Sequence, residues 1–249
     1  MTRKREVEVT VDVPQTVTTA LADQPVEGRV CLEAGAGVGN TTAGLLAAGA
    51  ARVYAVTNDA DHAELVRERV VRGESDRAAV LEADLRELPL ATGSVELVTA
   101  HGLFNVVDPA ALDAICAELA RVAAPDCSLV VDDYEPLPEG AKMRDLFALE
   151  NAASELARSR AALTFYPATT LRRLFTGWGW EFEREVTLLD PVPWTASHVD
   201  AHANVVRSLA SALPAELSTP LTAEADRLVG DIGSESVGEM YSIAFRSRE

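Results

Sequence analysis

The sequence predicts an α/β fold in which a mostly parallel sheet is covered by helices on both faces and carries a helical cap. Short apolar segments alternate with amphipathic ones over residues 28–135, and longer amphipathic segments dominate afterwards. Continuous apolar strands that alternate with helices are typical of parallel sheets. With 249 residues, the chain can build one sizeable core. We expect a single domain over residues 1–249, with a core at 28–135 and helical insertions at 136–177 and 190–239.

The chain opens on a segment with a two-residue period. "EVEVTVDV" places valines at alternate positions, which predicts a strand that ends at Pro14. "QTVTTALA" then predicts a short helix. Pairing of the first segment with a second copy of the chain is left open, and with it a homodimer.

Five buried strands and their helices follow. The strands are "RVCLEA", "RVYAVT", "AAVLEADL", "SVELVTAH" and "CSLVVDDY". The helices between them are "NTTAGLLAAGA", "DADHAELVRERVVRG" with Gly73 at its end, and "DPAALDAICAELARVAAP". In the last, Asp108 suits the N-cap and Pro109 the first turn. Ligands of such sheets bind at the carboxyl ends of the strands, so we expect the site there.

The rest of the chain predicts the cap and two more strands. Helices are expected at "PEGAKMRDLFALENAASELARSRAAL", "PATTLRRLFTGWG", "ASHVDAHANVVRSLASAL" and "PLTAEADRLVG". "WEFEREVTL" alternates polar and apolar residues, which predicts a strand near a sheet edge, and "MYSIAFR" predicts the last strand. Segment 139–163 is amphipathic and forms either a lid over the site or plain packing against the sheet. Its apolar residues include Met143, Leu146, Phe147 and Leu156.

Charge and composition restrict the setting. The net charge is −17, and only Lys4 and Lys142 are lysine. Acid-rich, lysine-poor surfaces suit a salty cytoplasm, which favours a halophilic source, and they disfavour a nucleic-acid partner. No apolar run reaches the length of a membrane span, and no secretory signal follows the basic start. We therefore expect a cytoplasmic protein, and the unpaired spacing of Cys31, Cys116 and Cys127 agrees with a reducing compartment.

The stretch "CLEAGAGVGN" follows the first buried strand and carries the strongest motif. Glu33 precedes glycines at 35, 37 and 39, and Asn40 stands where a dinucleotide-binding loop would have its third glycine. An acid at this place is unfavourable beside a pyrophosphate. It suits a ligand that bears an ammonium group.

This stretch resembles the first motif of the class I S-adenosylmethionine-dependent methyltransferases, and the likeness continues in order over roughly residues 28 to 190. Within the family it is closest to the small-molecule branch, which includes methyltransferase type 11 and quinone-type enzymes. The resemblance implies a Rossmann-like, doubly wound, mostly parallel seven-stranded sheet with an antiparallel last strand, and S-adenosylmethionine as cofactor. The stretches that carry it are "VCLEAGAGVG", "VLEADLRELPL", "GSVELVTAHGLFNVVD" and "AELARVAAPDCSLVVDDYEP".

The resemblance also implies which residues bind the cofactor. The acid and the loop backbone would hold its methionine end, Asp84 would bond the adenine amino group beside Leu85, and His101 would line the methyl-transfer pocket. The loop residues are Glu33, Gly35, Ala36, Gly37 and Gly39.

The second strand departs from the family pattern. Thr57 stands where the family usually has an acid that grips both ribose hydroxyls. Asn58 would supply neutral hydrogen bonds instead, or Asp59 would reach back. Loss of one charge-assisted bond costs about 1–2 kcal/mol. The departure permits binding and leaves room for a non-catalytic relative.

Candidate catalytic residues follow strands four and five. His101 suits a base, with a pocket-wall or backbone-contact role as the alternative. Asp132, Asp133 and Tyr134 end the fifth strand, where one of them would bind or deprotonate the acceptor; a solvated loop edge is the alternative. Asn105 lies in a similarly placed loop and is a weaker candidate for acceptor contact.

Two other groups have competing interpretations. His198 and His202 are four residues apart on a predicted helix, but no third ligand is evident, so a partly exposed helix face is favoured and no metal is expected. Trp178, Trp180 and Trp194 either line an apolar pocket or pack in the core.

The acceptor is expected to be a small organic molecule. No Asn-Pro-Pro-Tyr-type segment follows strand four, where "HGLFNV" stands, and no basic extension is visible. A non-catalytic, S-adenosylmethionine-binding regulatory or partner subunit is the alternative. An oxidoreductase with a dinucleotide is disfavoured by Asn40 and by the missing ribose acid.

Overall fold

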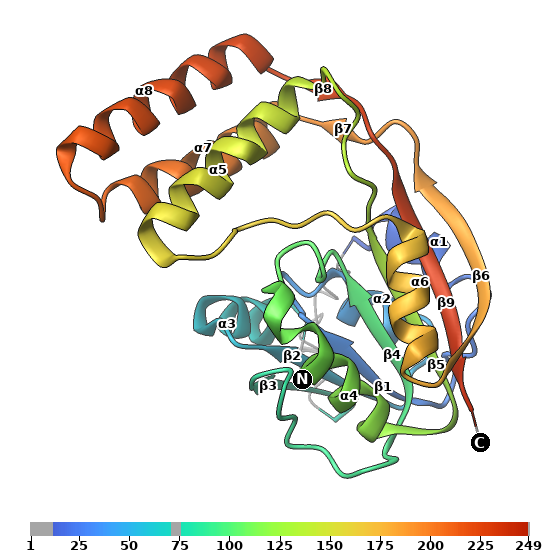
Figure 1. Ribbon diagram of the computed structural model, residues 1–249. Helices are drawn as coiled ribbons and strands as arrows, with labels where there is room; N and C mark the ends of the chain where they lie inside the picture. The colour runs from blue at the N-terminus through green and yellow to red at the C-terminus, as the bar shows by residue number, and fades with distance from the viewer. Residues whose placement is uncertain (1–11, 71–75, 249) are drawn as a thin grey trace, which may run out of the picture.

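The computed structural model describes residues 12–70 and 76–248, and one seven-stranded sheet organises them (Figure 1). The strands are β1 (Val30–Ala34), β2 (Arg52–Thr57), β3 (Ala78–Glu82), β4 (Val95–His101), β5 (Ala123–Tyr134), β6 (Trp180–Leu189) and β9 (Met240–Ser247). Their order is β3-β2-β1-β4-β5-β9-β6. The first five strands pair in parallel, and β9 runs antiparallel to β5 and β6. The predicted seven-stranded sheet with a reversed last strand is confirmed, and β6 is an edge strand as expected.

Helices cover both faces of this sheet (Figure 1). On one face lie α1 (Gln15–Leu21), α2 (Asn40–Ala47) and α3 (Ala60–Arg69), and on the other α4 (Leu112–Val122) and α6 (Ala168–Gly177). The helix expected from Asp108 starts with a short 3-10 turn, Pro109–Ala111, and Asp108 caps it by accepting a hydrogen bond from the Ala110 amide at 2.9 Å.

The main hydrophobic core lies between the sheet and the layer formed by α4 and α6. Leu119 of α4 and Phe175 of α6 are fully buried there, and the Phe175 ring packs on Phe104 and Phe245 at centroid distances of 5.4 Å. Helix α6 therefore belongs to the sheet layers. The cap range expected at 136–177 extends too far, because its last helix covers the sheet.

A separate cap stands over the carboxyl end of the sheet. It contains α5 (Lys142–Arg158), α7 (Ala196–Ala210), α8 (Ala215–Ile232) and the two-stranded pair of β7 (Pro193–Trp194) and β8 (Glu235–Ser236). Met143 and Leu146 of α5 share a second core with Val206 of α7 and Leu228 of α8. Segment 139–163 thus packs against other cap helices and not on the sheet face. Figure 1 shows the connection from α5 to α6 crossing between the cap and the sheet.

Two sequence expectations lie outside the described residues. These are most of the strand "EVEVTVDV", of which only Asp12 and Val13 are described, and Gly73. Asp12 and Val13 are not part of a strand. In the described part of the chain, no helix is both long and apolar enough to cross a membrane.

Candidate active site

The candidate residues gather along one edge of the sheet. Strands β1, β2, β4 and β5 run parallel and end together, which places Glu33, Thr57, His101 and Asp133 on the same edge. His101 stands directly opposite Asp132 in the strand register. Parallel strands bind ligands at this edge because the loops that follow them converge there.

The glycine loop after β1 has a backbone that only glycine adopts readily. Gly35, Gly37 and Gly39 have φ values of +77°, +50° and +83°. The amides of Gly35 and Ala36 both donate to the Val56 carbonyl of β2, at 3.0 and 2.8 Å. A Cβ at Gly35 would lie 2.7 Å from a Leu103 methyl, whereas at Gly37 the nearest atom would be 4.0 Å away. The loop is therefore anchored at its start and open at Gly37.

Glu33 is a buried carboxylate immediately before this loop. Its side chain accepts a hydrogen bond from the Thr42 hydroxyl of α2, and the residue is only 2% exposed. Burial raises the pKa of Glu33 to about 7, although the threonine hydrogen bonds and the nearby His101 act in the opposite direction. Burial makes the negative charge of this carboxylate unfavourable. A cation placed beside it would therefore stabilise the ionised form.

His101 and Asp132 form a hydrogen-bonded pair across β4 and β5. Nδ1 of His101 lies 2.9 Å from Oδ2 of Asp132, and the imidazole is 24% exposed. Burial lowers the pKa of His101, but the hydrogen bond and charge of Asp132, with Glu33 and Asp133, outweigh it and leave the pKa raised. Since a carboxylate only accepts hydrogen bonds, Nδ1 carries a proton, and in the neutral imidazole Nε2 is the nitrogen that can accept one.

Asp133 holds the loop after β4. Its oxygens accept hydrogen bonds from the backbone amide and the side-chain amide of Asn105, at 3.0 and 2.9 Å, and from the Tyr134 amide at 2.8 Å. Burial raises the pKa of Asp133 to about 6, against these hydrogen bonds. Asp132 and Asp133 are both buried. The alternative of a solvated loop edge is therefore wrong for both, because β5 runs through the middle of the sheet.

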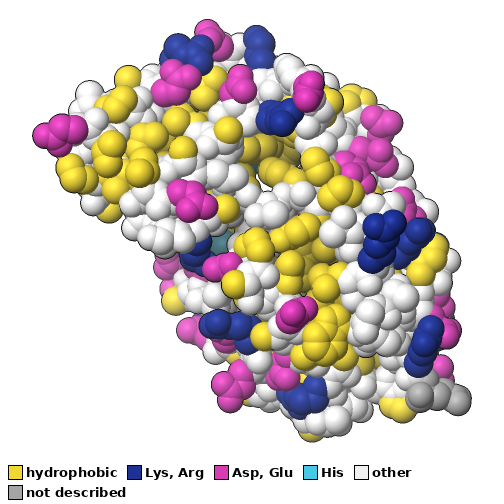
Figure 2. Space-filling model, in the orientation of Figure 1, with side chains coloured by type: hydrophobic (Ala, Val, Ile, Leu, Met, Phe, Trp, Pro, Cys, Tyr) yellow, Lys and Arg dark blue, Asp and Glu magenta, His cyan; other side chains and the backbone are white. Residues whose placement is uncertain are grey.

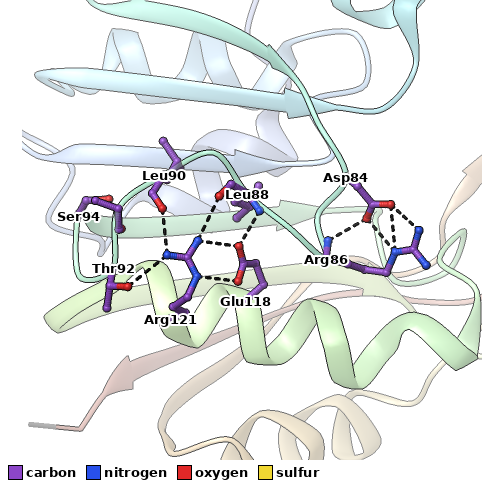
Figure 3. A network of polar contacts seen from close by, with 9 residues as sticks. Asp84, Arg86, Leu88, Leu90, Thr92, Ser94, Glu118 and Arg121 are labelled. Carbon is purple, nitrogen blue, oxygen red and sulfur yellow. Dashed lines mark hydrogen bonds and ion pairs between the residues drawn. The ribbon is translucent and has the colours of Figure 1, made fainter.

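Asp84 lies just after β3 and is engaged by a neighbour (Figure 3). Arg86 donates to it from its backbone amide at 2.9 Å and from its guanidinium at 2.5–3.0 Å. The Arg86 hydrogen bonds lower the pKa of Asp84 to about 2. Leu85 is half-buried against the main core.

A clamp from α4 fixes the loop that follows Asp84. Glu118 and Arg121 pair with each other at 2.6 Å. Glu118 also accepts from the Leu88 amide at 2.6 Å, and Arg121 donates to the carbonyls of Leu88 and Leu90 at 3.1 and 3.0 Å (Figure 3). Sequence reasoning missed this clamp. Its only signal was an acid and an arginine three residues apart on a helix, which is usually a surface pair.

The end of β2 uses its polar groups internally. The Thr57 hydroxyl is buried and accepts from the Asp59 amide at 3.1 Å. Oδ1 of Asp59 caps α3 by accepting from the His62 amide at 2.9 Å, so that carboxylate serves the helix and does not reach back over the strand end. Asn58, which lies between Thr57 and Asp59, is exposed, and so is Asp59.

The tryptophan and histidine candidates of the second half of the chain do not follow the parallel strands. Trp180 is in the main core and Trp178 is 38% exposed, whereas Trp194 lies in the cap. His198 is exposed, and His202 bonds Glu150 at 2.7 Å. Within residues 12–70 and 76–248, no group of three or more His, Cys, Asp or Glu side chains is placed to hold a metal ion.

A cavity of about 270 Å³ lies between the cap and the strand ends. In Figure 2 the molecule is hollowed between these two parts, with hydrophobic side chains along the hollow. Sequence reasoning named half of the lining residues but did not bring them together, because they come from segments far apart in the chain. The lining residues are Asn105, Val106, Tyr134, Phe147, Leu163, Phe165, Leu189, Val192, Pro193, Trp194, His198 and His202.

Comparison with protein families gives one match. Residues 31–126 match the model of a methyltransferase domain. They run from β1 into the first residues of β5 and so include the glycine loop, Asp84, His101 and Asn105.

Two curated relatives agree with this match over part of their length. A demethylmenaquinone methyltransferase of Clavibacter sepedonicus is 34% identical over 156 residues, which are 60% of this chain and 61% of the relative. Ribosomal RNA small subunit methyltransferase A of Rhodopseudomonas palustris is 32% identical over 111 residues, 43% of this chain and 38% of the relative. The chain thus spans about three fifths of the first and two fifths of the second.

Solved structures show the same fold at low identity. A structure from Bacillus halodurans, assigned as a methyltransferase without proof of activity, has a TM-score of 0.65 at 14% identity, covering 94% of this chain and 99% of that one. Geranyl diphosphate methyltransferase in complex with its methyl donor has a TM-score of 0.60 at 17% identity, covering 92% and 83%. These likenesses show the fold alone, which is the Rossmann-like fold of those neighbours.

Proposed function

We propose that this chain, in which residues 31–126 form a methyltransferase domain, transfers a methyl group from S-adenosylmethionine to a small organic acceptor. The observation that carries the proposal is the buried Glu33 carboxylate, which stands before an open glycine loop at the carboxyl edge of the sheet. The ammonium group at the amino-acid end of S-adenosylmethionine would supply a positive charge beside the Glu33 carboxylate.

The residues present fit the cofactor. Glu33 would bind its ammonium group and the loop backbone its methionine chain, Asp84 with Leu85 would receive the adenine, and Thr57 with Asn58 would face the ribose. When bound, S-adenosylmethionine supplies a methyl group activated by its sulfonium. The loop residues in this proposal are Gly35, Ala36, Gly37 and Gly39.

The chain's own residues would position the acceptor and move its proton. Methyl transfer depends mainly on alignment of two reactants and on exclusion of water. The cap supplies the cover, and His101 supplies a base. Asp132 fixes the proton on Nδ1 of His101, so Nε2 can take the proton that the acceptor loses. Asp133 positions Asn105 beside the cavity, and Tyr134 lines its wall.

A small acceptor is favoured by the size of the cavity and by the charge. About 270 Å³ accommodates a small molecule but no folded nucleic acid. The net charge of −17 opposes a polyanion. The demethylmenaquinone and geranyl diphosphate relatives are named for small organic acceptors, whereas the ribosomal RNA relative keeps RNA as the competing class.

One observation favours a second candidate function. At the end of β2 a neutral threonine and a helix-capping aspartate stand in place of a free ribose-binding acid. A protein that binds S-adenosylmethionine without turning it over, as a regulatory or partner subunit, would tolerate this change.

Calorimetric titration with S-adenosylmethionine and with S-adenosylhomocysteine, in molar potassium chloride, tests the proposal. We expect micromolar binding of both, followed by S-adenosylhomocysteine release when acceptors are added. Binding without turnover across a broad panel of acceptors would favour the second candidate. If the folded protein binds neither compound, both functions are wrong.

The charge also leads us to propose that the protein works at high salt in the cytoplasm. Acidic surfaces repel themselves, and salt screens that repulsion. Unfolding by urea should therefore need higher urea concentrations in 2 M than in 0.1 M potassium chloride. An unchanged midpoint would oppose a halophilic source.

A further inference from the structure

The cavity under the cap is walled by aromatic rings that contact one another. Phe147 of α5 packs on Phe165 of the α5–α6 connection at a centroid distance of 5.1 Å and on Trp194 of β7 at 5.3 Å. Tyr134 of β5 lies 5.3 Å from Trp194. Rings locked in this way by their neighbours form a rigid apolar wall, which favours a flat apolar ligand.

His202 supplies a polar group in this apolar wall. It lines the cavity, and its imidazole packs edge-on against Phe147 at 4.7 Å. Its Nδ1 lies 2.7 Å from Oε2 of Glu150, which is 4% exposed. The pair joins α7 to α5 across the cap. Because Glu150 occupies Nδ1 and fixes the tautomer, Nε2 is the atom that His202 can offer to a ligand.

Asn105 supplies a second polar group, on the sheet side of the cavity. Its side-chain nitrogen and backbone amide donate to Asp133. Its backbone carbonyl accepts a hydrogen bond from the Thr164 amide at 2.7 Å. Since Asp133 takes the nitrogen, the side-chain oxygen Oδ1 is left for a ligand. The cavity therefore has aromatic walls, an acceptor atom at the sheet and an imidazole at the cap.

We propose that this cavity binds a neutral, planar aromatic ring that bears a hydroxyl group, and that His202, positioned by Glu150, recognises the hydroxyl. The assignment rests on the proposed function, since it names the acceptor class of that site. A cavity of about 150 Å³ holds one benzene ring, so the volume of about 270 Å³ suits one ring or two fused rings.

Charged ligands fit less well. No Asp, Glu, Lys or Arg is among the residues that line the cavity in the described chain, so neither a cation nor an anion finds a counter-charge there. Aromatic walls do attract quaternary ammonium groups, which makes choline the informative competitor. A hydroxyl suits the imidazole in either charge state because it both donates and accepts hydrogen bonds.

The test uses 2-naphthol as the probe, with naphthalene and 2-methoxynaphthalene as matched compounds that cannot donate the hydrogen bond. Binding to the full-length protein is measured by quenching of tryptophan fluorescence, without cofactor. We expect 2-naphthol to bind about two- to thirteen-fold more tightly than either matched compound, the range that one hydrogen bond contributes. Trp194→Phe should remove most of the quenching, because Trp178 and Trp180 lie outside the cavity.

Variants test whether the Glu150–His202 pair causes the preference for 2-naphthol. His202→Phe should weaken 2-naphthol about tenfold and leave naphthalene unchanged. Glu150→Gln keeps the contact to Nδ1 and should lie between His202→Phe and wild type, and Glu155→Gln on the exposed face of α5 is the control. If His202→Phe fails to fold, the comparison of the three compounds on the wild-type protein still decides.

Equal affinity for the three compounds, or tighter binding of choline than of 2-naphthol, would overturn the proposal. Titration of the same protein with S-adenosylhomocysteine distinguishes failure of this acceptor proposal from failure of the proposed methyl transfer. If it binds and 2-naphthol shows no preference, only the acceptor class is wrong. If 2-naphthol binds as expected and S-adenosylhomocysteine does not, methyl transfer is wrong and the ring site stands.

Discussion

Asp133 accepts hydrogen bonds from both amides of Asn105, the backbone N–H at 3.0 Å and the side-chain Nδ2 at 2.9 Å. This contact ties the interior strand β5 to the loop after β4. It also fixes the side chain of Asn105, which lines the cavity under the cap. A single buried carboxylate at the strand ends thus holds part of the cavity wall in place.

Asp133→Ala should destabilise the protein and damage the cavity more than the cofactor site. Three buried donors, the two of Asn105 and the Tyr134 amide, lose their acceptor. Each unsatisfied buried donor costs about 1–3 kcal/mol, and partial relaxation brings the expected total to about 3 kcal/mol. Urea denaturation measures it, with the exposed Asp113→Asn as control. A loss below about 1 kcal/mol would show that the loop does not depend on Asp133.

Glu33→Gln should stabilise the ligand-free protein at neutral pH. The pKa of Glu33 rises from 4.5 unfolded to about 7 folded, so the folded state binds more protons between these values. Stability contributed by this group therefore falls as pH rises from about 4.5 to 7. At about 1.4 kcal/mol per pKa unit, the variant should be roughly 3–4 kcal/mol more stable at pH 8 and equal to wild type below pH 4.5. Parallel denaturation curves over pH 4–8 check this, with Glu64→Gln as the exposed control.

The same carboxyl predicts a proton released on cofactor binding. A cationic group beside Glu33 favours its ionised form and lowers its pKa. At pH 6.5, titration with S-adenosylmethionine in buffers of different ionisation enthalpy should show net proton release, which Glu33→Gln should abolish along with most of the affinity. Buffer-independent heats with tight binding would place the ammonium group away from Glu33.

The ion pair of Asp84 with Arg86 makes a sharper test of the adenine contact. If Asp84 bonds the adenine amino group, Asp84→Ala should weaken S-adenosylhomocysteine by about 1–3 kcal/mol. Arg86→Ala frees the carboxylate oxygens that the guanidinium now contacts and should leave affinity unchanged or raise it. Calorimetry on both variants decides, and a loss in Arg86→Ala equal to that in Asp84→Ala would mean that the pair only holds the loop.

Periodicity predicted the sheet and its helices because each strand and helix has its own local signal. "RVYAVT" is apolar enough to be buried on both faces, and the bounds of β2 match it. The motif at Glu33 and Gly35 lies at the carboxyl edge that the sequence predicts for a ligand, since the carboxyl ends of parallel strands share one side. The sequence alone could therefore predict features that depend on one short stretch of the chain.

Features that depend on distant segments were not. The cavity is lined by residues from α5, the connection before α6, β7 and α7. The residues next to Phe165 and His202 in the sequence form no motif that predicts a place in the cavity wall. The Glu150–His202 pair spans fifty-two positions. Helix α6 was placed in the cap because its amphipathic pattern shows that one face is buried, and that pattern cannot show whether the sheet or another helix buries it.

Two glycines with positive φ and open space around them separate ligand blocking from loss of fold. Gly37 and Gly179 have φ values of +50° and +90°, and a Cβ would meet no atom closer than 4.0 Å at the first and none within 4 Å at the second. Alanine at either position carries mainly the cost of a left-handed backbone, about 1–2 kcal/mol. The two variants should therefore lose similar stability in urea denaturation.

Binding should distinguish them completely if the loop holds the methyl donor. The open approach at Gly37 is the space that the cofactor's methionine chain would occupy, so Gly37→Ala should weaken S-adenosylhomocysteine at least tenfold and Gly37→Val should abolish binding. Gly179 lies between α6 and β6, far along the chain from the loop, and Gly179→Ala should bind like wild type. Equal affinities in the two alanine variants, at equal stability, would remove the loop from the binding site, because only Gly37 lies in the loop that the cofactor would contact.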